Sequence, residues 1–527
     1  IRDKLVTGVQ TCALPIYNTY KTDPTQWDIL LDSKGAADYL ANYYLNKLSP
    51  TSFKESVRNC CFVNDPTLDD FSLQEARDLV SRTNPFLRSL FDSLAGADRD
   101  PRIDWLFDDL VDIFRHVNFS ELLQKDTNLR TDPFLYFYEH FLEKYDKETK
   151  VKRGVYYTPQ PIVKFIVNAV DKILKTDFQL SSGLADTTRI STTSEPNFKV
   201  QILDPAIGTG TFLAEVIRKI YEKFSNQKGA WNDYVEHSLI PRLHGFEIMM
   251  TPYVICHIKL EKLLAETGYK KSSRMQVYLT NSLESGTQNN HSLFSNWIIR
   301  EAQQANYVKE NAALMVIIGN PPYSVSSCNK NEYIDGLTKI YKEGLNEKNI
   351  QPLSDDYIKF IRLGENFIEK NQEGILAYIS NNTFLDARIH RKMREHLLKT
   401  FDKIFVINLH GNARKKEKSP DGSKDENVFD IMTGVCVTIF VKIKDCSNEF
   451  AKVYYMDLFG TRDRKFDYLK SHLMRDDDFI EVKPKAPQYF FVPKDFSLQE
   501  EYDRGFRIDE MFEENNCGIV SGNDKDR

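Results

Sequence analysis

The stretch that decides the fold is Val200-Gln201-Ile202-Leu203-Asp204-Pro205-Ala206-Ile207-Gly208-Thr209-Gly210-Thr211-Phe212-Leu213. It opens with a short apolar run, Val200 to Leu203, and then turns through an acidic residue and two glycines. The apolar residues that follow at helical spacing are Leu213, Val216, Ile217 and Ile220. A buried strand that leads through a glycine-rich turn into an amphipathic helix is typical of an α/β sheet whose ligands bind at the carboxyl edge.

The two glycines of this turn, Gly208 and Gly210, permit a close approach of the backbone to a ligand. The third glycine of the dinucleotide fingerprint is absent, because Leu213 stands in its place, and no lysine of a phosphate-binding loop follows. The carboxylate of Asp204 instead suits a ligand with a cationic amino-acid head, such as methionine joined to adenosine. A purely structural turn accounts for the two glycines equally well.

Further strands are expected where short apolar runs end in turn residues. These runs are Leu243 to Phe246, Leu314 to Ile318, Ile375 to Ile379 and Ile404 to Leu409. Their alternation with helical segments predicts a mostly parallel, doubly wound sheet from about Gly154 onwards. A last run, Gly434 to Ile443, leaves no room for a well-packed crossover helix and is expected to close the sheet antiparallel.

Two polar residues stand at the ends of later strands. Glu247 follows the second strand, where an acidic side chain can accept hydrogen bonds from both hydroxyls of a ribose. Asn281 ends the next short strand, and its amide can pair with the edge of an adenine ring. A solvated loop glutamate remains the alternative for Glu247.

A capped helix start lies upstream, at Tyr157-Thr158-Pro159. The helix that follows carries Pro161 in its first turn and one apolar face, made of Ile162, Phe165, Ile166, Ala169 and Ile173. The unpaired backbone amides of such a helix start favour a carboxylate, such as that of a methionine group.

The loop Asn320-Pro321-Pro322-Tyr323 follows the strongest buried strand, Leu314 to Ile318. Methylation of an exocyclic amine requires its nitrogen lone pair, which is delocalised into the ring, to point at the electrophilic methyl group. The Asn320 side-chain oxygen and the Pro321 carbonyl suit the two amine hydrogens, and Tyr323 offers a face for stacking the base. The alternative is a rigid proline turn capped by asparagine that has only a structural role.

Taken in order, these motifs resemble the gamma-order adenine-N6 DNA methyltransferases from about Gly154 to Lys444. The segment RGVYYTP and the later NVFDIMTGV at Asn427 to Val435 are similar to the single-polypeptide, Type I-like (Type ISP) or Type IIG restriction-modification enzymes. The resemblance implies a Rossmann-like methyltransferase fold, the cofactor S-adenosyl-L-methionine and, as substrate, an adenine flipped out of double-stranded DNA.

The resemblance also assigns roles to individual residues and implies no metal. Target-base contacts fall on Asn320, Pro321, Pro322 and Tyr323, and Phe429 either adds a second stacking face or is a core residue. Asn281 stands where the family commonly has an aspartate. Cofactor contacts are expected at Tyr157, Thr158, Pro159, Asp204, Pro205, Ala206, Gly208, Gly210, Glu247 and Asn281.

The composition describes a globular chain with 41% hydrophobic and 28% charged residues. It contains no apolar run of the ~20 residues that cross a bilayer and no convincing signal peptide, so we expect a soluble, intracellular protein. The resemblance to restriction-modification enzymes implies that this location is the cytoplasm of a prokaryote. The eight cysteines form no CxxC pair, which indicates reduced thiols. A net charge of -6 gives no overall attraction to DNA, so binding depends on local basic clusters.

Two basic clusters are candidates for phosphate contact. One contains Arg388, Arg391, Lys392 and Arg394, and the other contains Arg414, Lys415, Lys416 and Lys418. A solvated helix face and a mobile loop explain them equally well.

Four segments are expected. Residues 1–17 include VTGVQTCALPI, which looks like a translated sequencing adapter, and residues 18–150 form a helical connector domain. The methyltransferase domain occupies 151–445, and 446–527 begin a truncated target recognition domain. The adapter-like start and the stop of the chain in the polar stretch SGNDKDR lead us to expect a fragment of a longer parent chain. No GxxxxGK[ST] motif is present here, so the helicase and nuclease modules that the resemblance implies would belong to that parent.

Two other functions stay open at this point. The Asn-Pro-Pro-Tyr chemistry also suits a protein-glutamine or RNA N-methyltransferase. A catalytically inactive DNA-binding or assembly fragment is the second alternative.

Overall fold

The computed structural model describes residues 158–190, 197–225, 227–271, 273–285, 296–323, 327–347, 349–446, 449–506 and 511. Tyr157, the adapter-like segment and the expected helical connector domain lie outside these residues. Within them, no helix is both long and apolar enough to cross a membrane.

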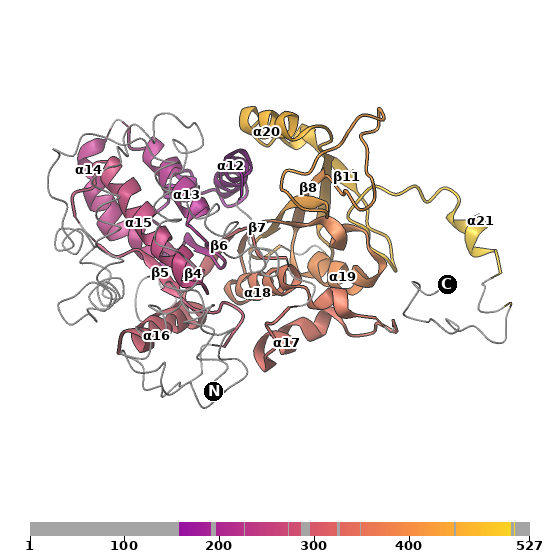
Figure 1. The fold of residues 1–527 in the computed structure, drawn as a ribbon, viewed down its shortest axis with the longest axis horizontal. Coiled ribbons are helices and arrows are strands. Elements are labelled where there is room, and N and C mark those ends of the chain that lie inside the picture. Colours follow the sequence, from indigo (N-terminus) through magenta and orange to yellow (C-terminus); the bar gives the residue numbers. More distant parts are fainter. Residues whose placement is uncertain are drawn as a thin grey trace, which may run out of the picture.

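One large sheet organises the described part of the chain (Figure 1). Its nine strands lie in the order β11-β10-β8-β9-β7-β6-β3-β4-β5. The strands are β3 (Gln201–Asp204), β4 (Leu243–Glu247), β5 (Gln276–Leu279), β6 (Leu314–Gly319), β7 (Gly374–Asn381), β8 (Lys403–His410), β9 (Val435–Lys442), β10 (Lys452–Asp457) and β11 (Ile480–Val482). A separate two-stranded ribbon pairs β1 (Arg189–Ile190) with β2 (Asn197–Phe198).

Most of the sheet is parallel, and its strand order reverses at β3. The chain runs outward from β3 through β4 to β5, and then crosses back to place β6 on the other side of β3. The carboxyl ends of β3 and β6 therefore lie side by side at a topological switch point, where open α/β sheets bind ligands. Strand β9 runs antiparallel between β7 and β8, as its sequence predicted.

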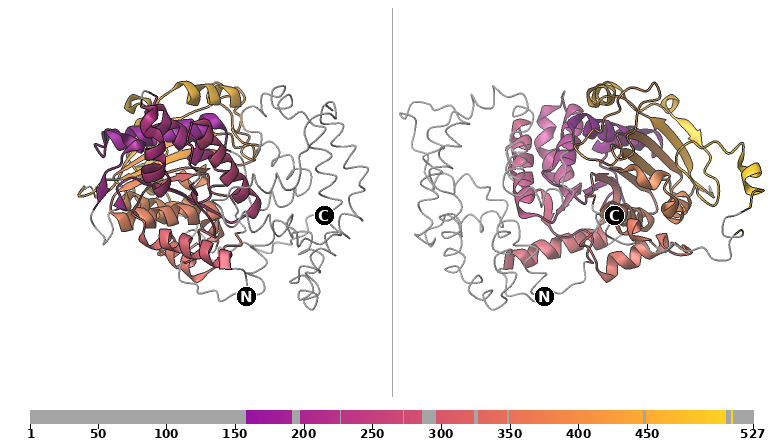
Figure 2. Two further views of the ribbon diagram at one scale, coloured as in Figure 1. Left: turned by 90° about the vertical axis from the view of Figure 1, so that its left-hand side faces the viewer. Right: turned by 45° about the vertical axis from the view of Figure 1, so that its right-hand side comes forward.

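Helices cover both faces of the sheet (Figure 2). One face carries α12 (Gln160–Thr176), α13 (Thr211–Glu222), α14 (Lys228–Tyr234), α15 (Met250–Glu266) and α20 (Arg462–Ser471). The other carries α16 (Asn296–Asn311), α17 (Glu332–Thr338), α18 (Asp356–Asn371) and α19 (Arg391–Thr400). A short helix, α21 (Gln499–Asp503), lies beyond the sheet.

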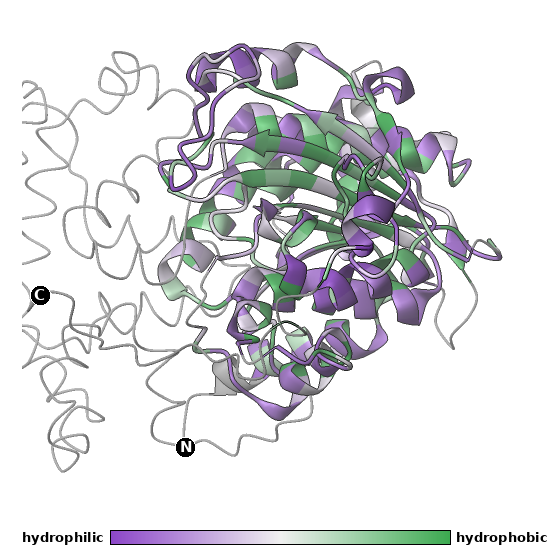
Figure 3. Ribbon diagram, turned by 90° about the vertical axis from the view of Figure 1, so that its right-hand side faces the viewer, coloured by the Kyte–Doolittle hydropathy of each residue, from purple (hydrophilic) through white to green (hydrophobic). Residues whose placement is uncertain are grey.

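The core forms two apolar layers because strand side chains alternate between the faces. In β7, Ile375 and Ile379 pack into the layer under α12, while Leu376 and Tyr378 pack into the layer under α18. Figure 3 shows the result, with apolar strands enclosed between helices whose outer surfaces are hydrophilic.

The positions of the strands and of the two motif-bearing helices are confirmed. The five apolar residues predicted to face the core from α12 are all buried, and so are the four predicted for α13. The sheet, however, does not end at residue 445, the expected domain boundary. Strand β10 pairs in parallel with β8, and β11 pairs with β10, so residues 452–482 extend the same sheet.

Candidate active site

Asp204 ends β3 at the switch point and is 1% exposed. Its Oδ1 accepts a hydrogen bond from the Ala206 backbone N–H at 3.1 Å. Its Oδ2 has no hydrogen-bond partner among the described residues. Burial raises the pKa of Asp204 to about 8, and the nearby carboxylate of Glu247 adds to the rise. A buried acid with an unsatisfied oxygen is prepared to receive a cation or a hydrogen-bond donor.

The glycine-rich turn connects Asp204 to α13. Gly208 and Gly210 both adopt left-handed backbone conformations, with φ of 55° and 82°. A side chain at Gly210 would meet the Cys256 sulfur at 2.7 Å, so this glycine lets the turn pack on α15. A side chain at Gly208 would instead point into open space. The glycine at 208 therefore leaves the backbone accessible, whereas the one at 210 is structural.

Glu247 ends β4 and closes the other side of the turn. Its Oε2 accepts from the Gly208 backbone N–H at 2.9 Å, and its Oε1 accepts from the Met249 backbone N–H at 2.7 Å. The solvated-loop alternative is thus wrong, because the side chain is 8% exposed and fixed by two backbone donors. Its place at the end of β4 is the one from which an acidic side chain can accept hydrogen bonds from ribose hydroxyls.

Asn281 lies in the loop that follows β5, next to Ser282, whose hydroxyl donates to the Pro205 carbonyl. The Asn281 amide donates to Glu284 Oε1 at 3.0 Å and to Asn329 Oδ1 at 3.2 Å. Its Oδ1 accepts from the Leu283 backbone N–H at 3.0 Å. The side chain that the sequence suggested for adenine contact therefore also holds its own loop together.

Asn320 and Tyr323 form a hydrogen-bonded unit at the carboxyl end of β6. The Asn320 amide donates to the Thr158 hydroxyl at 3.0 Å, a contact across 162 positions of sequence. The Tyr323 hydroxyl donates to Asn320 Oδ1 at 2.7 Å, and its oxygen also lies 3.3 Å from the Ile379 carbonyl of β7. Pro321 is buried and Pro322 half-buried, and the Tyr323 ring meets the edge of Tyr357 at a centroid distance of 6.3 Å.

The preceding residue, Gly319, explains how Asn320 comes close to Asp204. A side chain at Gly319 would lie 2.7 Å from Asp204 Oδ1, so only glycine allows β6 to end against the buried acid. The sequence alone gives no sign that glycine is required here, since the requirement comes from the neighbouring strand β3. Among the described residues, those expected at the carboxyl ends of β3, β4, β5 and β6 thus lie at one edge of the sheet.

Phe429 lies in the loop between β8 and β9 and is 5% exposed. Its backbone N–H donates to Asn427 Oδ1 at 2.9 Å, and its carbonyl accepts from Arg462 at 3.0 Å. The ring belongs to the same apolar layer against which Tyr323 packs. Its packing is that of a core residue, and a stacking role stays a prediction.

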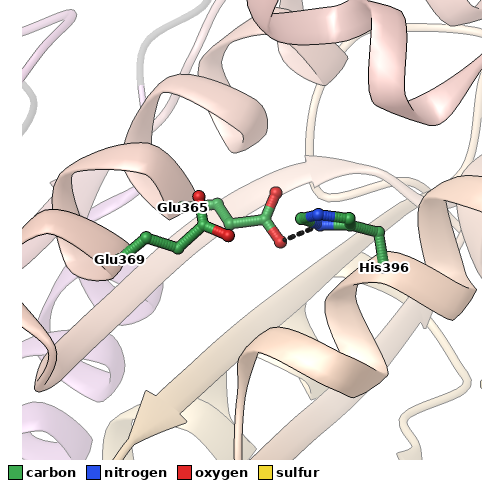
Figure 4. A group of neighbouring side chains, drawn as sticks. All are labelled: Glu365, Glu369 and His396. Atoms are coloured by element: carbon green, nitrogen blue, oxygen red, sulfur yellow. Dashed lines mark hydrogen bonds and ion pairs between the residues drawn. The ribbon is translucent and has the colours of Figure 1, made fainter.

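Outside this edge, one group of metal-ligand type occurs in the described residues, Glu365, Glu369 and His396 (Figure 4). Glu365 is fully buried and receives hydrogen bonds from His396 at 2.7 Å and from Tyr341 at 2.6 Å. The Arg362 guanidinium lies 2.8 Å from both glutamates. Because arginine already supplies the cation, the group is a structural ion network joining α18 to α19.

Comparisons with known proteins agree with this geometry. The family model described as N-6 DNA Methylase matches residues 130–412, more than half of the chain. The Type II methyltransferase M.BstVI of Geobacillus stearothermophilus is 23% identical over 220 residues, which are 41% of this chain and 34% of that protein.

Solved structures share the fold. The ATP-dependent Type ISP restriction-modification enzyme LlaBIII bound to DNA matches with a TM-score of 0.67 and 23% identity, covering 90% of this chain and 33% of that one. A nuclease-deletion mutant of the Type ISP enzyme LlaGI, in complex with a DNA substrate mimic, matches with a TM-score of 0.64 and 21% identity, covering 90% and 39%. The chain therefore spans about a third of the length of the relatives that it resembles.

Proposed function

The chain belongs to the N-6 DNA methylase family, and from this premise we propose that it transfers a methyl group from S-adenosyl-L-methionine to N6 of an adenine in double-stranded DNA. One observation carries the proposal: Asn320, which directly follows β6 where Gly319 packs on the buried Asp204, is held by Thr158 and Tyr323 at the switch point of the sheet. Sulfonium cofactors supply an electrophilic methyl group, so the protein has to bind and orient the two reactants.

The residues around Asp204 fit such a cofactor. Among the described residues, Asp204 Oδ2 has no hydrogen-bond partner and the position of a Cβ at Gly208 is open. The first suits a cationic amino group, and the second admits the chain that joins methionine to adenosine. Glu247, fixed by two backbone donors, suits the ribose hydroxyls. Helix α12 begins directly after Pro159, and the positive end of its dipole favours a carboxylate there. Thr158, Pro205, Ala206 and Gly210 line the same site, and Asn281, in the loop after β5, is the residue that we propose for contact with the adenine ring of the cofactor.

Asn320 and Pro321 orient the target amine. The Asn320 Oδ1 and the Pro321 carbonyl accept its two hydrogens, so that the nitrogen lone pair turns towards the methyl group. The same oxygens stabilise the positive charge that grows on nitrogen during transfer. Reaching this position requires the adenine to leave the base stack, and the rings of Tyr323 and Phe429 are the stacking partners that we propose for it.

The broader setting is also part of the proposal. We place the methyltransferase domain from residue 151 to the end of β11 at Val482, past the boundary at 445 that the sequence suggested, and place the beginning of a recognition domain after it. The likeness to Type ISP structures supports a single-polypeptide restriction-modification parent in the prokaryotic cytoplasm, with helicase and nuclease modules elsewhere in that parent.

A transfer assay tests the proposal. The purified chain is incubated with methyl-labelled cofactor and, separately, with duplex DNA, protein and RNA. Label is expected in DNA, at adenine N6, and an Asn320→Ala variant is expected to lose it while retaining cofactor binding. If label enters only protein or only RNA, the methyl acceptor is that molecule and the proposed DNA substrate is wrong. Cofactor and DNA binding with no transfer to any acceptor would indicate an inactive binding fragment.

A further inference from the structure

The loop between β8 and β9, residues 411–434, has no net charge by sequence. It contains five basic residues, Arg414, Lys415, Lys416, Lys418 and Lys424. It also contains five acidic residues, Glu417, Asp421, Asp425, Glu426 and Asp430. From composition alone, such a loop offers no attraction to a polyanion.

Two of the acids, Asp425 and Glu417, form contacts with residues outside the loop. Asp425 pairs with Lys465 of α20 at 2.8 Å, and both side chains are fully buried. Asp425 also accepts from the backbone N–H groups of Gly411 and Gly460. Its charge is therefore cancelled inside the protein, and the bonds tie the loop to the chain that follows β10.

Glu417 contacts His410, the last residue of β8. The two ring nitrogens of His410 face Glu417 at 2.8 Å and Asp457 at 2.7 Å. Burial alone would lower the pKa of His410, but the two carboxylates outweigh burial and raise it. Glu417 additionally accepts from the Asn412 backbone N–H at 3.0 Å, so its carboxylate is turned towards the base of the loop.

Two further acids also have cationic partners. Glu426 pairs with Lys424 at 2.6 Å and accepts from the Arg462 backbone N–H at 3.0 Å. Asp430 pairs with the Arg462 side chain at 2.7 Å. Asp421 is exposed and accepts from Ser423. Four of the five acids therefore have a basic partner, and for three of them this partner lies outside the loop.

The remaining basic side chains stay on the surface. Arg414, Lys415, Lys416 and Lys418 are all exposed, and none forms an ion pair with any residue that the structure describes. The other basic cluster differs. Arg394 is buried and donates to three backbone carbonyls, Arg391 pairs with Glu347, and Lys392 pairs with Glu395.

The exposed cluster lies on the same edge of the sheet as the candidate active site. Strand β8 runs parallel to β10 and antiparallel to β9, which in turn is antiparallel to β7, so β8 ends at the edge where β6 and β7 end. The loop returns to β9 at Gly434, whose carbonyl accepts from the Asn382 backbone N–H just after β7. Tyr323 bonds to the same strand at Ile379.

We propose that the β8–β9 loop is a DNA-backbone-binding element whose Arg414, Lys415, Lys416 and Lys418 contact phosphates beside the target adenine. The inference rests on the proposed function and names the surface by which the chain holds its duplex. Because phosphate contacts are independent of sequence, this element contributes affinity and orientation and leaves the choice of site to other residues.

Salt dependence of duplex binding by the full chain tests the inference. The variant Lys415→Gln/Lys416→Gln removes two exposed charges from the loop. The slope of log affinity against log salt is expected to become shallower by about 0.9 for each phosphate that the variant no longer neutralises. Substitution of all four basic residues is expected to flatten it further, equally for cognate and unrelated duplexes.

The matched control is Lys270→Gln/Lys271→Gln, an adjacent exposed pair that precedes β5 at the opposite edge of the sheet. It changes the net charge equally and is expected to leave the slope unchanged. An unchanged slope for the loop variant, or equal changes for both pairs, would overturn the inference while leaving methyl transfer by the wild type intact. A wild type that binds no DNA would overturn the inference and the proposed function together, and cofactor titration reports whether each variant is folded.

Discussion

The Tyr323 hydroxyl donates a 2.7 Å hydrogen bond to Oδ1 of Asn320. This oxygen is the one proposed to accept a hydrogen of the target amine, so tyrosine and substrate share an acceptor. An amide oxygen has two lone pairs, and the amine therefore either joins the hydroxyl or displaces it. The tyrosine ring and the tyrosine hydroxyl consequently have separable roles.

Two substitutions at Tyr323 separate these roles. Tyr323→Phe keeps the ring and removes the competing donor, so methyl transfer is expected to stay near the wild-type rate. Tyr323→Ala removes the stacking face, which is worth roughly 1–3 kcal/mol per base, and is expected to raise KM for DNA accordingly. Steady-state kinetics checks both, and equal losses in the two variants would mean that the hydroxyl, not the ring, matters.

Thr158 is expected to act by positioning Asn320. Its hydroxyl accepts from the Asn320 amide at 3.0 Å and thereby fixes which way the amide oxygen points. Loss of one such bond costs about 0.5–1.5 kcal/mol, so Thr158→Val is expected to lower kcat by up to about tenfold. Asn320→Ala is expected to lower it by roughly 10²–10³, the cost of removing one charge-stabilising group.

Rescue distinguishes positioning from a general structural role. Thr158→Ser keeps the hydroxyl and is expected to restore kcat, while KM for DNA and the melting temperature stay near wild type in all Thr158 variants. A Thr158→Ser enzyme as slow as Thr158→Val would contradict the positioning role.

The buried carboxyl group of Asp204 is expected to lower the free energy of unfolding near neutral pH and to contribute to cofactor binding. Its pKa is about 8 in the folded chain against an ordinary value of 3.8. Between these pH values the folded state keeps a proton that the unfolded state has released, so the free energy of unfolding falls as pH rises through this window. Asp204→Asn removes the titrating group and is expected to melt higher than wild type at pH 7 to 8.

The same substitution is expected to weaken binding of S-adenosyl-L-methionine at least tenfold, because the amide cannot balance a cationic amino group. Thermal melts from pH 4 to 8 and calorimetric titration provide the two measurements. Tight cofactor binding by Asp204→Asn would exclude the carboxylate as a ligand. A melting temperature below that of the wild type at pH 8 would contradict the raised pKa.

The buried pair of Lys465 and Asp425 is expected to be costly to break. Lys465→Met leaves Asp425 as an uncompensated buried charge, which typically costs about 3–5 kcal/mol. It also removes the donor to the Leu409 and Glu426 carbonyls. Denaturant unfolding measures the loss, and partial recovery in Lys465→Met/Asp425→Ala is expected because the isolated charge is then gone.

The control for this pair is Lys424→Met, which breaks the ion pair with Glu426 but removes a largely exposed lysine. Exposed pairs contribute about 0–1 kcal/mol, so a small change is expected. Equal losses in Lys465→Met and Lys424→Met would show that the buried pair does not anchor the loop.

Local sequence patterns predicted the elements of the sheet well. Apolar runs marked β3, β4, β6, β7, β8 and β9, since burial on both faces of a strand leaves a continuous apolar signature. The extension by β10 and β11 was missed. The run from Lys452 to Asp457 alternates in exposure near the edge of the sheet and therefore carries a weaker signal.

The sequence by itself determined the order of the motifs and the chemistry of their side chains, because a strand followed by a polar turn is a local property of the chain. Only the tertiary structure decided which of them meet. Thr158 bonds to Asn320, and Gly319 packs against Asp204. Three acids of the β8–β9 loop pair with residues outside it, namely His410, Lys465 and Arg462. Pairing between distant residues depends on strand order and burial, and so a loop neutral in sequence presents a basic surface in the folded protein.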